Sequence, residues 1–250
     1  MCKAKENKYT VLAFATAKEM HKSLAFAART LPSKLELGRP FAWQWQNRDF
    51  LLLLTGIGPI NAALSLGKLL GEGLPLNGVV NIGIAGSFDL NQYPLGKSLL
   101  VTEEIWPEFG LCTNNGVFPE ELGHALGRSG REQIWNRIEF NSKNNIKALG
   151  LSSLDDLPCV RSISVSGVSG TPERASFLYT EYRPQLENME GFALAWACSN
   201  AELPFVELRS VSNLVGSREK SYWDIKGGLQ ALGKSCRLLL DVFEEARDYK

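Results

Sequence analysis

The chain has 250 residues, of which 44% are hydrophobic and 22% are charged, an ordinary composition for a globular protein with a sizeable core. Its 27 basic residues balance 27 acidic residues, which argues against a broad electrostatic field that would favour nucleic acid or an anionic membrane. No long linker rich in Pro, Gly or Ser divides the chain, so we expect residues 1–250 to form a single domain.

The cysteines and histidines indicate neither a metal centre nor a disulfide framework. The five cysteines are scattered and form no C-x-x-C pair, which is typical of reduced, buried thiols in a cytosolic protein. His21 and His124 are far apart, so the sequence predicts no zinc site. The charged N-terminus leads into an apolar run too short for a signal peptide, and longer apolar runs are interrupted before a spanning length of about 20 residues. We therefore expect a cytoplasmic protein without a membrane or nucleic-acid partner.

Apolar strands, small-residue turns and helices alternate along the chain. Apolar runs predict strands at residues 9–16, 41–55 (a hairpin leading to a buried strand), 78–84, 97–101, 162–168 and 205–211. Helical spacing follows at residues 17–28, 61–70, 172 onward, 191–200 and 229–243. Ala85-Gly86-Ser87 predicts a turn after the third run. This alternation predicts an α/β fold with a mixed central sheet and helices on both faces.

Residues 103–145 form the least regular part of the chain, because Pro, Gly and Asn repeatedly break its periodicity. Long loops in compact domains commonly act as lids or binding loops. The stretch from Trp106 to Phe118 could therefore cover one end of a ligand, or its aromatic side chains could belong to a core beneath a loop.

Polar or small residues follow four of the predicted strands, at Glu19, at residues 55–58, at residues 83–87 and at Asn213. Ligands of open α/β sheets bind beyond the carboxyl ends of the strands, so we expect these positions to converge. Three of these positions also have a structural interpretation. Glu19 could be a first-turn glutamate favoured by the helix dipole, Asn213 could serve a turn, and the glycines lack a complete phosphate-loop pattern.

Glu190 is harder to explain by structure alone. It precedes a predicted helix and lies among Met189, Gly191 and Phe192, where burial would require hydrogen-bond partners such as hydroxyl groups. Glu190 and Asn213 together predict two walls of a small-molecule site.

Three segments follow Glu19 in a fixed order: Val79 to Ser87, Glu187-Asn188-Met189-Glu190-Gly191, and Arg209-Ser210-Val211-Ser212-Asn213. In this order they resemble the purine nucleoside phosphorylase and nucleosidase superfamily. The resemblance runs from about Val11 to Phe243 and leaves only the region from Trp106 to Leu157 unanchored. The Asn-Met-Glu-Gly segment and the tail from Ser212 to Arg218 are most similar to the futalosine hydrolase branch.

The resemblance implies roles for individual residues. In the nucleosidase branch a Met-Glu pair holds the ribose, and a glutamate at the first strand exit deprotonates the attacking water. Met189 with Glu190 matches the first feature, and Glu19 matches the second. Further substrate contacts are implied at Ala85, Gly86, Val168, Asn188 and Arg218. Arg218 could pair with a carboxylate on the substrate or lie on a surface turn; Arg209 and Trp223 are weaker candidates.

Two departures from the superfamily pattern favour a subclass. Phosphorylases place arginines at the first strand exit and near the small-residue turn to hold phosphate, but residues 14–19 and 81–86 contain none. A dianion without a bidentate clamp binds poorly, which favours water as the nucleophile. Lys18 is no substitute, because it should point away from Glu19 on a helix. Asn213 stands where adenosine-type nucleosidases carry an aspartate. Its amide can donate to N7 and O6 of a 6-oxopurine, which favours hypoxanthine as the leaving group.

The resemblance therefore implies an N-ribosyl hydrolase that cleaves futalosine to hypoxanthine and dehypoxanthine futalosine, a step in an alternative route to menaquinone. It implies no metal and no organic cofactor, a nucleoside substrate, and a homo-oligomer (a dimer or larger). The alternatives are a methylthioadenosine/S-adenosylhomocysteine nucleosidase, a phosphorylase, and a non-catalytic nucleoside-binding protein.

Overall fold

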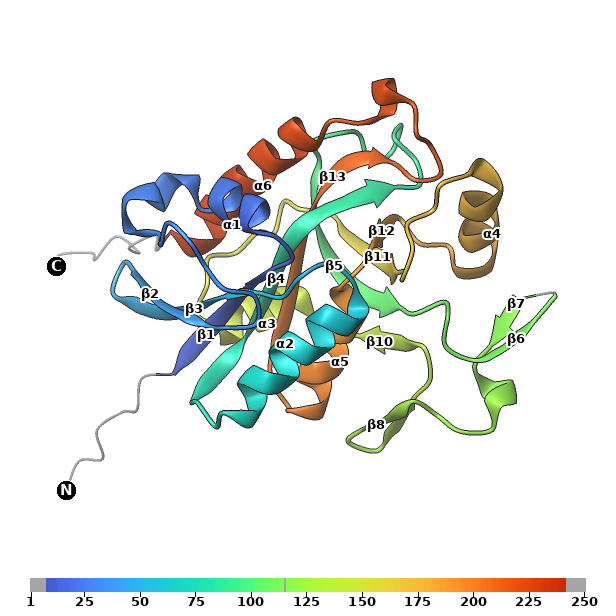
Figure 1. Ribbon diagram of the computed structural model, residues 1–250, viewed down its shortest axis with the longest axis horizontal. Helices are drawn as coiled ribbons and strands as arrows, with labels where there is room; N and C mark the ends of the chain where they lie inside the picture. The colour runs from blue at the N-terminus through green and yellow to red at the C-terminus, as the bar shows by residue number, and fades with distance from the viewer. Residues whose placement is uncertain (1–7, 115, 242–250) are drawn as a thin grey trace, which may run out of the picture.

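A nine-stranded mixed sheet forms the centre of the molecule (Figure 1). The computed structural model describes residues 8–114 and 116–241. Strands β3, β1, β4 and β13 are parallel neighbours, in that order, and β2 closes one edge as an antiparallel hairpin with β3. Their bounds are β1 Tyr9–Phe14, β2 Phe41–Trp45, β3 Arg48–Leu54, β4 Leu76–Ser87 and β13 Phe205–Leu214.

The other half of the sheet mixes strand directions. Strand β5 pairs in parallel with β11 but antiparallel with β13 and β10, and β12 pairs in parallel with β11 but antiparallel with β4. Their bounds are β5 Ser98–Ile105, β10 Arg137–Glu139, β11 Cys159–Ser164 and β12 Leu186–Asn188. The prediction of a mixed central sheet is therefore confirmed.

Helices cover both faces of the sheet, as predicted (Figure 1). One core joins the sheet to α1 and α6 through Met20, Leu24 and Leu232, and a second joins the opposite face to α2 and α5 through Leu66 and Leu194. The helix bounds are α1 Ala17–Ser23, α2 Pro59–Gly71, α3 Ser142–Ala148, α4 Pro172–Tyr182, α5 Gly191–Asn200 and α6 Ile225–Leu240. Short 3₁₀ turns lie at η1 Ala25–Thr30, η2 Glu120–Leu122 and η3 Lys220–Tyr222.

Several predicted boundaries were wrong. Ala85 to Ser87 do not form a turn, because β4 is paired on both sides through Ser87, with Leu186 of β12 and Leu214 of β13. The helix predicted at 17–28 ends at Ser23, where a 3₁₀ turn follows. The strand predicted at 97–101 continues to Ile105, and that predicted at 162–168 lies at 159–164. Phe243, the predicted end of the last helix, lies outside the described residues.

The irregular region is largely two small hairpins, β6 (Leu111–Thr113) with β7 (Gly116–Phe118) and β8 (Gly127–Ser129) with β9 (Glu132–Ile134). Trp106 stacks on Phe109 and packs against Phe192 of α5. Its aromatic ring therefore belongs to the core, which was one of the two alternatives.

The prediction of buried thiols holds for two of the four described cysteines. Cys198 and Cys236 are buried, whereas Cys112 and Cys159 are exposed; Cys2 lies outside the described residues. No helix in the described part of the chain combines the length and apolar character needed to span a bilayer.

Candidate active site

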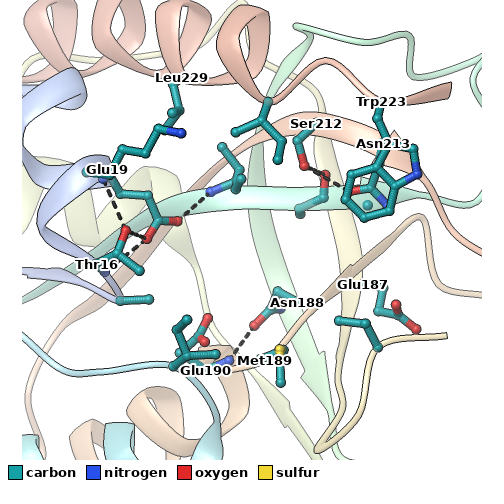
Figure 2. Close-up of a pocket in the computed structure, with 18 of the residues that line it drawn as sticks. Thr16, Glu19, Glu187, Asn188, Met189, Glu190, Ser212, Asn213, Trp223 and Leu229 are labelled. Atoms are coloured by element: carbon teal, nitrogen blue, oxygen red, sulfur yellow. Dashed lines mark hydrogen bonds between the residues drawn. The ribbon is translucent and has the colours of Figure 1, made fainter. Parts of the chain in front are cut away.

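A cavity of about 370 Å³ opens at the carboxyl ends of β1, β4 and β13 (Figure 2). It brings together segments that are up to about two hundred positions apart in the sequence. All nine predicted site residues line it: Glu19, Ala85, Gly86, Val168, Asn188, Met189, Glu190, Asn213 and Arg218.

Glu19 is fixed at one end of the cavity by its position in α1. It is the third residue of the helix and forms a capping box with Thr16, whose backbone N–H and hydroxyl donate to Glu19 Oε2 at 3.0 and 2.8 Å. The backbone N–H of Ile84 on β4 donates to the other oxygen, Oε1, at 3.2 Å. Glu19 therefore does lie in the first turn of a helix, as the helix-dipole interpretation requires. The same carboxylate also lines the cavity.

Glu190 lies at the same end, at the N-terminus of α5. The backbone N–H of Gly58 donates to Glu190 Oε1 at 2.9 Å, and the guanidinium of Arg209 lies 3.9 Å from Oε2. Burial raises the pKa of Glu190, while the charge of Arg209 and the Gly58 hydrogen bond oppose that rise. Gly58 has a φ of 91°, which a glycine adopts without strain.

Arg209 itself does not line the cavity. Its side chain is 1% exposed and lies behind Glu190, where it donates to Glu207 at 2.7 Å and to Asn188 Oδ1 at 3.2 Å. A Cβ at Gly83 would collide with this guanidinium, so the glycine on β4 makes room for it. Arg209 is thus the counterion of buried carboxylates.

Asn188 connects the cavity wall to this buried layer. Its amide nitrogen donates to Glu104 at 2.6 Å and to Ser162 at 2.7 Å, which leaves Oδ1 to accept the backbone N–H groups of Glu190 and Gly191 at 2.9 and 2.7 Å. These bonds fix the turn that carries Met189 and Glu190 into the cavity.

Glu104 and Glu207 form a fully buried carboxyl pair beneath Asn188. Burial and the neighbouring Glu207 raise the pKa of Glu104 well above its ordinary value. A protonated Glu104 can donate to Glu207, whose Oε2 otherwise lacks a hydrogen-bond partner. A Cβ at Gly191 would collide with both carboxyl groups, which explains the glycine after Glu190.

Asn213 lies at the opposite end of the cavity from Glu19 and Glu190 (Figure 2). Its Oδ1 accepts a hydrogen bond from Ser212 at 2.9 Å, and its Nδ2 donates to the backbone oxygen of Leu214 at 3.2 Å. The amide nitrogen carries two hydrogens and Leu214 accepts one of them, so one amide hydrogen of Asn213 remains for a ligand.

Two cations line the exposed parts of the cavity. Arg218 stands over the ring of Trp223, 5.6 Å from its centroid, and Trp223 also lines the cavity. Lys18 lines the rim as well, which corrects the expectation that it points away, because α1 is exposed at this position.

Three residues that were not predicted from the sequence also line the cavity: Glu187, Ser169 and Ser212. The buried pair Glu104 and Glu207 was not predicted either. The available signal was the spacing of Glu207 and Arg209, which share one face of a strand and are therefore suited to pair.

Comparison with known proteins identifies the family of this chain. The family model of the phosphorylase superfamily matches residues 15–243. The chain belongs to the phosphorylase superfamily. It is 34% identical to the futalosine hydrolase of Thermus thermophilus, an alignment that covers 84% of this chain and 92% of that protein.

The chain is also similar to more distant proteins. The chain is 28% identical to a 5'-methylthioadenosine/S-adenosylhomocysteine nucleosidase of Geobacillus, over 67% of this chain and 69% of the relative. Its fold is similar to the solved futalosine hydrolase of Helicobacter pylori, with a TM-score of 0.70 and 18% identity over 93% of this chain and 98% of that one. The fold class predicted from the sequence is therefore confirmed.

Proposed function

We propose that this protein is an N-ribosyl hydrolase that cleaves futalosine with water into hypoxanthine and dehypoxanthine futalosine. The observation that carries the proposal is the arrangement of one cavity, with two fixed carboxylates, Glu19 and Glu190, at one end and the amide of Asn213 at the other. The similarity to futalosine hydrolases over most of the chain supports it.

Glu19 activates the attacking water in this proposal. Three hydrogen bonds from Thr16 and Ile84 hold its carboxylate in place. The water oxygen bonds to C1' of the ribose while the C1'–N9 bond breaks, and the water gives a proton to Glu19. Backbone groups of Ala85 and Gly86 flank that water.

The described residues that line the cavity include no pair of cations near Glu19 that could hold phosphate. This favours water as the nucleophile. Among the described lining residues the cations are Lys18 and Arg218. Lys18 is an exposed point charge, and Arg218 lies over Trp223 near Asn213, so neither forms a bidentate clamp beside Glu19.

Glu190 holds the ribose by accepting hydrogens from its hydroxyl groups, and Met189 packs against the sugar. Desolvation strengthens hydrogen bonds to the carboxylate, and the charge of the buried Arg209 opposes the rise in its pKa that burial causes. As the glycosidic bond breaks, positive charge grows on the ribose and this end of the cavity stabilises it.

Asn213 receives the base. The departing hypoxanthine takes the electron pair of the C1'–N9 bond, and the free amide hydrogen of Asn213 donates to N7 or O6, where negative charge grows. Asn213 cannot titrate, so it suits a base that leaves as an anion. Val168, which is 43% exposed, also lines the cavity.

Arg218 pairs with the carboxylate on the non-purine end of futalosine in this proposal. Its guanidinium is exposed and positioned by Trp223. The protein would act in the cytoplasm, in menaquinone biosynthesis by the futalosine route, with residues 1–250 as one nucleosidase domain.

We also propose a homodimer or larger assembly. Four large apolar side chains are strongly exposed around the start of α2: Leu37 (60%), Ile57 (57%), Ile60 (81%) and Leu64 (68%). Ile57 also lines the cavity, so a second copy on this face would extend the cavity wall. Light scattering should give at least twice the mass of 27.6 kDa, and Ile60→Asp should lower it; a monomeric wild type would contradict the assembly.

Base release distinguishes the proposed activity from its neighbours. The protein is incubated separately with futalosine, inosine and methylthioadenosine, with and without phosphate, and free bases and ribose products are separated. We expect hypoxanthine from futalosine at a rate independent of phosphate. Rapid adenine release from methylthioadenosine with inert futalosine would refute the assignment.

A further inference from the structure

Glu187 is a buried carboxylate in the cavity that the proposed hydrolysis does not use. It belongs to β12 and is 5% exposed. Ser169 holds both of its oxygens, with the backbone N–H 2.9 Å from Oε1 and the hydroxyl 2.5 Å from Oε2. Burial raises the pKa of Glu187, and the two bonds from Ser169 oppose the rise. The fold therefore supplies dedicated donors to a carboxylate beside the ligand space.

Glu187 and Asn213 lie on either side of a single strand. Both are in register with Gly86, Glu187 from β12 and Asn213 from β13, on opposite sides of β4. Residues paired in register project from the same face of a sheet, and two strand spacings separate them by about 9–10 Å. The absence of a side chain at Gly86 lets the Asn213 amide approach β4, because a Cβ there would lie 3.0 Å from Nδ2 and would collide with Val215. Figure 2 shows Glu187 at the end of the cavity where Asn213 lies, away from Glu19 and Glu190.

The two side chains have opposite hydrogen-bonding character. Asn213 presents an amide hydrogen, because its amide nitrogen carries two hydrogens and donates one to the backbone oxygen of Leu214. Glu187 presents oxygens with free lone pairs, because an ionised carboxylate only accepts. A planar base that accepts at one edge and donates at the other fits between them, with a hydrogen bond of about 2.9 Å on each side.

A 6-oxopurine meets both requirements, and a 6-aminopurine does not. Hypoxanthine has acceptors at N7 and O6 and a donor at N1–H. In adenine, N1 is an acceptor and would face the oxygens of Glu187, while its amino group would face the donor of Asn213. The backbone N–H of Ser169 could serve N1 of adenine, but Glu187 already occupies it.

We propose that Glu187 is a specificity-determining residue that accepts the N1 hydrogen of a 6-oxopurine base bound by Asn213. The inference rests on the proposed function for the orientation of the base. It adds a second side chain that recognises the base, at the edge opposite to the one that Asn213 contacts.

Binding of free bases tests the inference without requiring catalysis. Hypoxanthine, 1-methylhypoxanthine and adenine are titrated into the wild type by calorimetry. We expect hypoxanthine to bind at least about 10-fold more tightly than either of the others, because each leaves Glu187 without its hydrogen. Equal affinity for hypoxanthine and 1-methylhypoxanthine would overturn the inference, and this comparison needs no variant.

The variant Glu187→Gln sharpens the test. Its carbonyl oxygen still accepts the N–H of Ser169, and its amide can donate to N1 of adenine, so the preference for hypoxanthine over adenine should fall about 10-fold or more. Glu181→Gln, which removes the same charge from an exposed position on α4, should keep the wild-type ratio. Matching ratios for Glu187→Gln and the wild type, with matching melting temperatures, would also overturn the inference.

The outcomes separate this inference from the proposed function. If the wild type fails to release hypoxanthine from futalosine, the proposed function fails whatever the base preference. If it releases hypoxanthine while Glu187→Gln keeps the wild-type preference, only the role of Glu187 fails.

Discussion

The two ends of the cavity are built on different principles. At the end assigned to water and ribose, backbone N–H groups of Thr16, Ile84 and Gly58 hold the carboxylates of Glu19 and Glu190. At the end assigned to the base, an amide lies near a carboxylate: Ser212 donates to Asn213, and the hydroxyl and backbone N–H of Ser169 donate to Glu187. The first end therefore presents two hydrogen-bond acceptors, whereas the second presents one donor and one acceptor. Substitutions at the first end should therefore remove the chemistry, and those at the second should redirect it.

The largest effect is expected from Glu19→Gln. Without a base for the water, kcat should fall by roughly 10²- to 10⁴-fold, while KM changes little. Steady-state kinetics with futalosine measure both. Glu36→Gln, which removes an exposed carboxylate from a surface ion pair, is the matched control and should behave as the wild type. Full activity of Glu19→Gln would remove Glu19 from the mechanism.

Glu190→Gln should weaken ribose binding in the transition state. Loss of a charged acceptor should lower kcat/KM by about 10- to 150-fold, from roughly 1.5–3 kcal/mol per charge-assisted bond. Because burial raises the pKa of Glu190 above 4.5, the wild type should lose activity as pH falls through that raised pKa, where the carboxylate becomes protonated. The variant should lack this acid limb in a pH profile of kcat/KM; retention of the same limb would assign it to another group.

Asn213→Asp should change the preferred base instead of abolishing the reaction. An aspartic acid can protonate N7 of a departing adenine, so the ratio of kcat/KM for futalosine to that for its 6-amino analogue should fall about 10-fold. Competition assays with both substrates give this ratio directly. An unchanged ratio would contradict the assignment of Asn213 to the base.

Arg218→Gln should have a smaller effect that depends on the substrate. An exposed ion pair contributes about 1 kcal/mol or less, so KM for futalosine should rise by roughly 5-fold at most. Inosine has no carboxylate, and its KM should not change. Equal increases for both substrates would indicate a structural role for Arg218.

Glu104→Gln should alter stability more than activity. The folded-state pKa of Glu104 is raised, so the folded protein binds more protons than the unfolded chain between the two pKa values, and stability falls as pH rises through that window. The glutamine amide can still donate to Glu207, so the variant should lose this part of the pH dependence. Urea unfolding between pH 5 and 8, compared with Glu139→Gln on the exposed face of β10, measures it. Identical pH dependence in the wild type and Glu104→Gln would argue against the shared proton.

Local patterns predicted the alternation of strands and helices but not where strand pairing stops. Ala85 to Ser87 have the small residues of a turn, yet strands remote in sequence extend β4 through them. The hairpins of the irregular region have strands of three residues, too short to show a period. Phe41–Trp45 was predicted well because Trp and Gln alternate in it, and Arg48–Leu54 because it ends in a continuous apolar run that follows directly.

Residues at strand ends were the predictable part of the site. Glu19, Glu190 and Asn213 attracted attention because a polar group there is either solvated or functional. Glu187 was missed because β12 has only three residues, and its cavity position depends on register with β4. Glu104 and Glu207 were missed because carboxyl groups inside apolar strands become interpretable only once their partner Arg209 is located.

A crystal structure with hypoxanthine bound tests the two-ended cavity most directly. We expect the amide of Asn213 within hydrogen-bond distance of N7 or O6, the carboxylate of Glu187 near N1, and Glu19 and Glu190 facing the empty ribose space. A base bound with its N7 and O6 edge turned away from Asn213 would contradict the account.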